Sequence, residues 1–213
     1  MEIYETEEEQ VAALKDWWKA NGTSVISGIV AAIIIVGGWN FWKNYQQDKM
    51  LQASTVYEQL LKANTAKSTD SIDKIAEKIK VNYAGTAYGA YALLFQAKAK
   101  FEQNELAAAG ALLQQVIESS SDDELKHVAR ARLVRVLLAE EKYEQGLQII
   151  ANVNQAKLGG FEGIYEELKG DLYVAMSRIG EARTAYQAAL TAGKSSPLLQ
   201  FKLDDLTAAD ESN

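Results

Sequence analysis

The pattern of apolar and polar positions divides the chain into one long uncharged run and a series of short amphipathic segments. Between Lys19 and Lys43 no residue carries a charge, and the centre of the run is almost entirely Val, Ile, Ala and Gly. A helix rises about 1.5 Å per residue, so about 20 residues span a hydrocarbon core of about 30 Å. All four tryptophans bracket the run, where membrane interfaces favour them: Trp17, Trp18, Trp39 and Trp42. The pattern predicts one transmembrane helix over residues 21–43.

Two other interpretations of this run are weaker. A cleaved signal peptide would have a basic start and a small-x-small cleavage site, whereas this chain begins with an acidic tract and the run ends in Gly37–Trp39. A buried core helix would leave the bracketing tryptophans unexplained. Two lysines lie close to each end of the run: Lys15, Lys19, Lys43 and Lys49. This balance leaves the orientation open, because the positive-inside rule counts Lys and Arg.

A stripe of small residues follows one side of the predicted membrane helix. Ser24, Gly28 and Ala32 recur at every fourth position, a spacing that lets another membrane helix approach closely. Small residues are also common in membrane helices that make no such contact. We therefore treat the stripe as a candidate packing face.

Residues 44–84 continue with apolar positions at helical spacing. One predicted helix covers residues 51–63, and a second surrounds Ile72, Ile75 and Ile79. A short polar stretch at residues 67–70 separates them and supplies candidate N-cap residues. We expect these two helices to connect the membrane segment to the remainder of the chain.

From residue 85 the chain shows an internal repeat of helix pairs. Ala109, Gly146 and Ala182 recur at intervals of 37 and 36 residues, close to the roughly 34 residues of a tetratricopeptide repeat. Small residues let two helices cross closely, and one pair cannot bury its apolar face alone, so pairs stack. Three other sets of equivalent positions recur at the same spacing in the repeats: Leu106, Tyr143 and Ile179; Leu113, Ile150 and Tyr186; Val116, Val153 and Ala189.

The repeat predicts an all-α fold, with a single N-terminal transmembrane helix followed by a tetratricopeptide-like α-solenoid over residues 85–213. We expect three degenerate repeats, since no copy carries the proline that usually ends the second helix. A final helix near Leu198 to Leu206 would cap the stack. The alternative is a plain helical bundle with coincidental spacing.

Composition narrows the classes of function. The 213 residues include 22 Lys and Arg against 29 Asp and Glu, a net charge of −7, which argues against nucleic acid as the main partner. The absence of cysteine excludes disulfides and thiolate metal sites. The single histidine, His127, excludes a histidine-rich metal site.

The residues that could act in catalysis do not form a recognisable catalytic arrangement in the sequence. His127 follows a Ser and Asp run at residues 119–123, where these residues suit the start of a helix. The segment Gly159–Gly163 lacks the Lys-Ser/Thr and the preceding strand of a phosphate-binding loop. Adjacent acids such as Glu166 and Glu167 splay over a helix surface. We expect no catalytic residue, cofactor, metal or small-molecule substrate, and therefore a non-enzymatic protein.

Stacked helix pairs offer a curved inner surface that binds peptides or proteins. In the repeat register, this surface takes the second, fifth, ninth and twelfth positions of the first helix of each pair. The candidates for this protein-binding groove are Tyr91, Leu94, Lys98 and Phe101; Val128, Ala131, Arg135 and Leu138; and Ile164, Glu167, Asp171 and Val174. Some of them are expected to lie in the core instead.

The amino-terminal third carries the most specific resemblance to a known family. Its features are the start Met1–Glu7, the segment from Gln10 to Trp18, Asn21-Gly22, and a membrane helix that ends in Gly37–Trp39. Together with the degenerate repeats, they make the chain resemble the YfgM family, the ancillary tetratricopeptide-like subunits of the bacterial SecYEG translocon.

The resemblance implies a single-pass type II protein of the bacterial inner membrane, with residues 1–20 as a short acidic cytoplasmic tail and a periplasmic repeat domain. It implies an adaptor whose partners are the SecYEG translocon and a PpiD-type periplasmic chaperone, and which passes emerging secreted or membrane chains to chaperones. It also implies restraint of a cytoplasmic stress-response regulator, for which the tail offers Glu2, Glu5, Glu7, Glu8 and Glu9. A generic scaffold for another envelope complex fits the residues equally well.

Overall fold

The computed structural model describes residues 7–154 and 158–211, and every regular element in these ranges is a helix. The helices are α1 (Glu7–Thr65), α2 (Thr69–Tyr83), α3 (Ala87–Glu102), α4 (Leu106–Ser119), α5 (Asp123–Ala139), α6 (Tyr143–Ala151), the 3-10 turn η2 (Gly159–Phe161), α7 (Glu162–Ala175), α8 (Ile179–Thr191) and α9 (Pro197–Glu211). The predicted all-α class is confirmed. Residues up to Gln52 form one unit, and residues from Ala53 form a second.

The first unit consists of the amino-terminal part of α1. Within the described residues, α1 alone is long and apolar enough to cross a membrane. The side chains of its uncharged run are largely exposed, and Ile33, Ile34 and Ile35 are 66–70% exposed. Such exposure is costly in water and favourable in lipid. The predicted membrane helix thus lies within a continuous helix that is a candidate membrane span.

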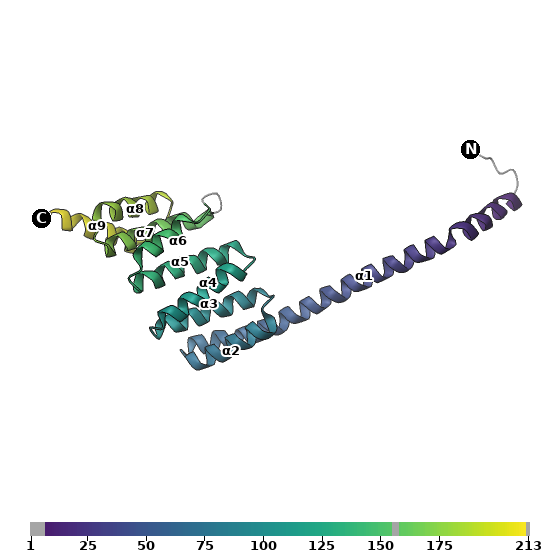
Figure 1. Cartoon of the computed structure of the whole chain (residues 1–213), viewed down its shortest axis with the longest axis horizontal. Coiled ribbons are helices and arrows are strands. Elements are labelled where there is room, and N and C mark those ends of the chain that lie inside the picture. The colour runs from purple at the N-terminus through teal and green to yellow at the C-terminus, as the bar shows by residue number, and fades with distance from the viewer. Residues whose placement is uncertain (1–6, 155–157, 212–213) are drawn as a thin grey trace. The chain divides into compact units, whose positions relative to one another are not determined.

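The second unit is a stack of antiparallel helix pairs. Figure 1 shows the helices from α2 to α9 stacked in chain order. The end of α1 pairs with α2 through Val56, Leu60, Ile72 and Ile79, which are at most 6% exposed. The pairs α3/α4, α5/α6 and α7/α8 follow, and α9 packs on the last of them through Leu199. Each pair buries its apolar face only because a neighbouring pair covers it.

The same turn joins the two helices of all four pairs. One residue in each turn has a left-handed backbone, with φ between 51° and 62°: Lys67, Asn104, Glu141 and Ser177. In each case the next N–H donates to the carbonyl five residues earlier, over 2.8–3.0 Å, which satisfies a carbonyl at the end of the first helix. The left-handed residues are separated by 37, 37 and 36 residues, so the array contains four repeats with one geometry.

From the sequence we expected the helices of this first repeat to be a divergent connecting pair that precedes the three repeats, rather than a repeat of the same geometry. At the crossing position, where later repeats have Ala109, Gly146 and Ala182, the first repeat has Ile72. All four residues are buried. The first repeat tolerates a large residue there, so the small-residue signature disappears while the backbone arrangement persists. The final helix is also longer than expected, since α9 covers Pro197–Glu211.

Candidate protein-binding surface

The first helices of the pairs carry the predicted binding positions, and the additional repeat extends this set. Counting back 37 residues from Tyr91, Leu94, Lys98 and Phe101 gives Ser54, Tyr57, Leu61 and Asn64. Positions of neighbouring repeats adjoin, since Lys98 Nζ donates to Asn64 Oδ1 over 3.1 Å. The rings of Tyr57 and Tyr91 lie 5.8 Å apart. We call the surface formed by these four positions of each repeat the inner surface.

A cluster of aromatic side chains surrounds Tyr57 and Tyr91 of the inner surface. The ring of Tyr57 lies 5.1 Å from that of Tyr88 and 6.0 Å from that of Phe95. Burial raises the pKa of the Tyr57 hydroxyl, and the nearby Tyr91 and Tyr88 raise it further. Tyr57 therefore remains neutral at physiological pH. The cluster offers half-buried rings with hydroxyl groups at their edges.

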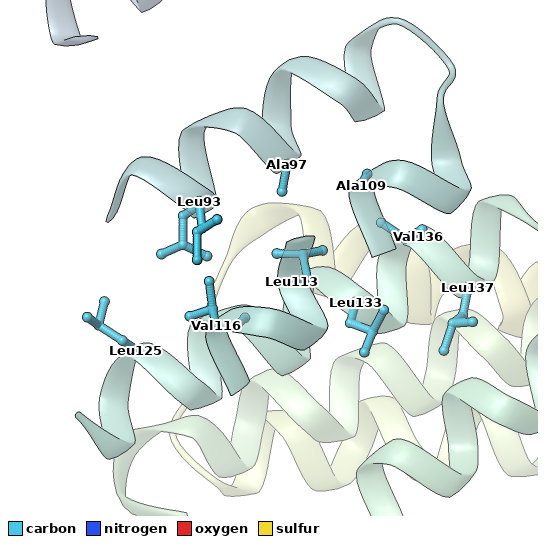
Figure 2. Close-up of a cluster of buried hydrophobic side chains, with 11 residues drawn as sticks. Leu93, Ala97, Ala109, Leu113, Val116, Leu125, Leu133, Val136 and Leu137 are labelled. Atoms are coloured by element: carbon cyan, nitrogen blue, oxygen red, sulfur yellow. The ribbon is translucent and has the colours of Figure 1, made fainter. Parts of the chain in front are cut away.

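A pocket of about 270 Å³ opens beside this cluster, between α3, α4 and α5. Its lining consists of Ala97, Lys98, Phe101, Leu113, Arg132, Arg135 and Val136. Figure 2 shows Ala97, Leu113 and Val136 on the three helices, facing the space that they share. Three of the predicted groove residues, Lys98, Phe101 and Arg135, thus line one pocket. Phe101 is 42% exposed, which is unusual for a phenylalanine without a partner.

Several other predicted groove residues belong wholly or partly to the core. Leu94 and Ala131 are 5% and 4% exposed, so they offer no open surface. These two positions turn toward the neighbouring helix of the stack, where apolar clusters enclose them. Four others are only half-buried: Tyr91, Val128, Leu138 and Ile164.

The acidic residues predicted for the last repeat are engaged within the chain. Lys202 of α9 donates to Glu167 over 2.9 Å and to Asp171 over 2.7 Å. Lys194 lies 3.0 Å from the other oxygen of Glu167, and the Tyr186 hydroxyl donates to Asp171 over 2.8 Å. This cluster holds α9 against α7. Val174, 38% exposed, lies beyond it.

The α9 ion cluster predicts a specific dependence of stability on pH. Burial alone would raise the pKa of the Glu167 carboxyl, but hydrogen bonds from Lys202 and Lys194 outweigh it and the pKa lies below its ordinary 4.5. A lowered pKa stabilises the fold above the unfolded value and loses that contribution as the pH falls through the folded value. Glu167→Gln should therefore cost about 2 kcal/mol near neutral pH.

The difference between Glu167→Gln and the parent chain should shrink as the pH falls below 4.5. Urea unfolding of both proteins at neutral and acidic pH measures it. The exposed Glu58, replaced by Gln in the same way, is the control and should leave stability unchanged at either pH. A difference that stays constant across this pH range would contradict the assigned ion cluster.

The start of α5 contains the only histidine, and its surroundings are structural. Asp122 caps the helix, since its Oδ1 accepts from the N–H groups of Glu124 and Leu125 over 2.8 and 3.1 Å. His127 is 4% exposed, with Nδ1 2.9 Å from the Tyr165 hydroxyl and its ring stacked on Phe161 at 5.0 Å. Among residues 7–154 and 158–211 no three His, Asp or Glu side chains gather as metal ligands.

The remaining predicted sites lie in the first unit. Ser24, Gly28 and Ala32 are exposed on α1, and a Cβ added at Gly28 would meet no atom within 4 Å. The stripe is therefore open for a neighbouring helix. Of the acidic tail, Glu7 begins α1 and Glu8 and Glu9 are exposed in its first turn, whereas Glu2 and Glu5 lie outside the described residues.

Comparison with known proteins matches this architecture over nearly the whole chain. Residues 15–208 match the family model of the tetratricopeptide repeat-like domain. A protein of Escherichia coli (strain K12) named ancillary SecYEG translocon subunit is 31% identical over 97% of this chain and 100% of its own length. Proteins of the same name in Haemophilus influenzae and Neisseria gonorrhoeae are 30% and 26% identical over 94% of this chain and 97% of their own. The chain therefore belongs to the YfgM family of ancillary SecYEG translocon subunits, which the amino-terminal tract had indicated.

Proposed function

We propose that the protein is a non-enzymatic, membrane-anchored adaptor of the SecYEG translocon. In this proposal α1 crosses the bacterial inner membrane with its amino terminus in the cytoplasm, and the repeats lie in the periplasm. The inner surface then holds a PpiD-type chaperone or a segment of an emerging chain. Tethering a partner beside the translocon raises its effective concentration without any chemistry.

The observation that carries this proposal is the open apolar surface of the first two repeats. Leu61 and Phe101 are 39% and 42% exposed. Leu61 lies one helical turn after Tyr57 in α1, and Phe101 lines the pocket between α3, α4 and α5. Exposed apolar side chains that adjoin one another mark binding sites more often than scattered ones do. The names of the relatives support the choice of the translocon, and the apolar run of α1 supports the anchor.

The experiment exploits the absence of cysteine from the natural sequence. Leu61→Cys places one thiol on the inner surface, and Val81→Cys places one on α2 of the same repeat, where Val81 is 70% exposed. A membrane-impermeant maleimide applied to spheroplasts should label both positions, because both lie in the periplasm. An impermeant thiol–amine cross-linker should then capture the chaperone or an emerging chain from position 61 several times more than from position 81.

The two measurements contradict different parts of the proposal. Labelling only after the membrane is permeabilised would place the repeats in the cytoplasm and reject the orientation. Labelling at both positions with equal capture, or with none, would reject the inner surface as the binding site. Co-purification of the translocon with both variants controls for correct assembly in the membrane.

A further inference from the structure

The pocket between α3, α4 and α5 carries positive charge that the protein itself does not neutralise. Arg132 and Arg135 lie one helical turn apart on α5 and both line the pocket. Across residues 7–154 and 158–211 neither has a carboxylate partner, and Arg132 donates only to the carbonyl oxygen of Leu94, over 3.3 Å. Lys98, on the opposite side, lies 3.7 Å from Glu102, a loose pair.

The local charge of the pocket is positive, whereas the chain as a whole has a net charge of −7. Two arginines at this spacing on a helix repel each other. Burial lowers the pKa of Arg132, and the charge of Arg135 lowers it further. An anion placed between the two guanidinium groups would relieve this repulsion and accept hydrogen bonds from both.

The rest of the lining is apolar and indicates what accompanies the anion. Ala97, Phe101, Leu113 and Val136 form the walls. A volume of about 270 Å³ lies below the range of about 300–1,000 Å³ that is usual for small-molecule sites. The pocket has room for one large side chain of a polypeptide.

We propose that this pocket binds a segment of a partner protein in which an Asp or Glu adjoins a large apolar side chain. The apolar side chain enters between Phe101 and Val136, and the carboxylate lies between Arg132 and Arg135. The inference rests on the proposed function and names the class of sequence that the inner surface prefers. It also gives the inner surface a direction, because its free positive charge lies at the second and third repeats, whereas the acids of the last repeat are already paired with Lys202 of α9.

The test uses the full chain in detergent micelles and fluorescein-labelled octapeptides. One peptide has the centre Asp-Leu-Phe-Glu, a second has Lys-Leu-Phe-Lys, and a third has Asp-Gly-Ser-Glu. Fluorescence anisotropy should show that the first binds at least about tenfold more tightly than either of the others, because only it satisfies both the charge and the apolar pocket. Glycerol phosphate in excess should not displace it.

Variants of the arginines separate charge recognition from folding. Arg132→Gln with Arg135→Gln should weaken the acidic peptide about tenfold and abolish the preference over the basic one. Lys74→Gln with Lys78→Gln makes the same change of net charge on exposed positions of α2 and should leave binding unchanged. The single variant Arg135→Glu should shift the preference toward the basic peptide. Far-UV circular dichroism and urea midpoints control for folding.

The outcomes distinguish this inference from the function on which it rests. Equal binding of acidic and basic peptides would overturn the inference while leaving an apolar binding surface intact. Displacement by glycerol phosphate would assign the arginines to a phosphate and also overturn it. Absence of binding by all three peptides would overturn it as well, and the cross-linking from position 61 would then decide separately whether the inner surface binds any partner.

Discussion

Leu172→Ala is expected to lower the free energy of unfolding of the repeat array by about 3–5 kcal/mol, the cost of emptying a fully enclosed leucine site. Leu172 is 0% exposed and lies in the cluster shared by α5, α6 and α7. Its side chain covers Gly146, where an added Cβ would lie 2.9 Å from Leu172 Cδ2. Glycine offers no side chain that could move into the cavity, so the loss should be near the upper end of the range.

Urea unfolding of the full chain, followed by far-UV circular dichroism, measures this effect. The tryptophans lie before residue 43, in the first unit, so their fluorescence does not report on the array. Leu198→Ala, at a position that is 60% exposed in α9, is the control and should cost less than about 1 kcal/mol. In the Leu172→Ala background, Gly146→Ala should recover stability, because its methyl group enters the cavity. If the losses of stability caused by Leu172→Ala and Gly146→Ala simply added in the double variant, that result would contradict the close crossing of α6 and α7.

Gly170→Ala is the second substitution with a large expected effect. A Cβ at this position would overlap Cε1 and Cδ1 of the Tyr186 ring. The ring has little freedom to move, since Tyr186 is 2% exposed and its hydroxyl donates to Asp171. Overpacking of this kind costs about 3 kcal/mol, which the better helix propensity of alanine offsets by at most about 1 kcal/mol.

The matched control for Gly170→Ala lies in the next helix. Gly180 is also helical, and a Cβ there would meet no atom within 4 Å. Gly180→Ala should be neutral or slightly stabilising. Gly170→Ala should therefore lower the thermal midpoint, whereas Gly180→Ala should leave it unchanged or raise it slightly. Thermal unfolding in the same detergent decides between them. A midpoint for Gly170→Ala that matches the parent would show that the α7/α8 crossing is looser than described.

The helix crossings of the last three repeats could be predicted from the sequence, whereas the first repeat and the shape of the turns could not. The crossings at Ala109, Gly146 and Ala182 were predictable because close helix contact requires small residues at a fixed spacing. The first repeat was not, since Ile72 replaces the small residue while the turn at Lys67 keeps its shape. The left-handed turn leaves no mark in the sequence, as Lys67, Asn104, Glu141 and Ser177 share no residue type.

The sequence predicted the repeat register of the candidate binding residues, but it predicted their exposure only in part. Lys98, Phe101 and Arg135 belong to two repeats, and their shared register brings them to one pocket. Leu94 and Ala131 satisfy the same register but face a neighbouring helix, which periodicity within one helix does not reveal. The pairing of Glu167 and Asp171 with Lys202 depends on how α9 docks, over separations of 35 and 31 residues. Such a contact is decided by tertiary packing.

The common turn of the four pairs has a consequence for how the chain reaches its native state. Each apolar cluster draws on helices that follow one another along the chain, and proteins rich in such local contacts fold quickly. Successive pairs can therefore form as soon as they are synthesised, each on the surface of the one before. We expect the nascent array to spend little time extended, and so to offer few unfolded segments that could associate with another copy.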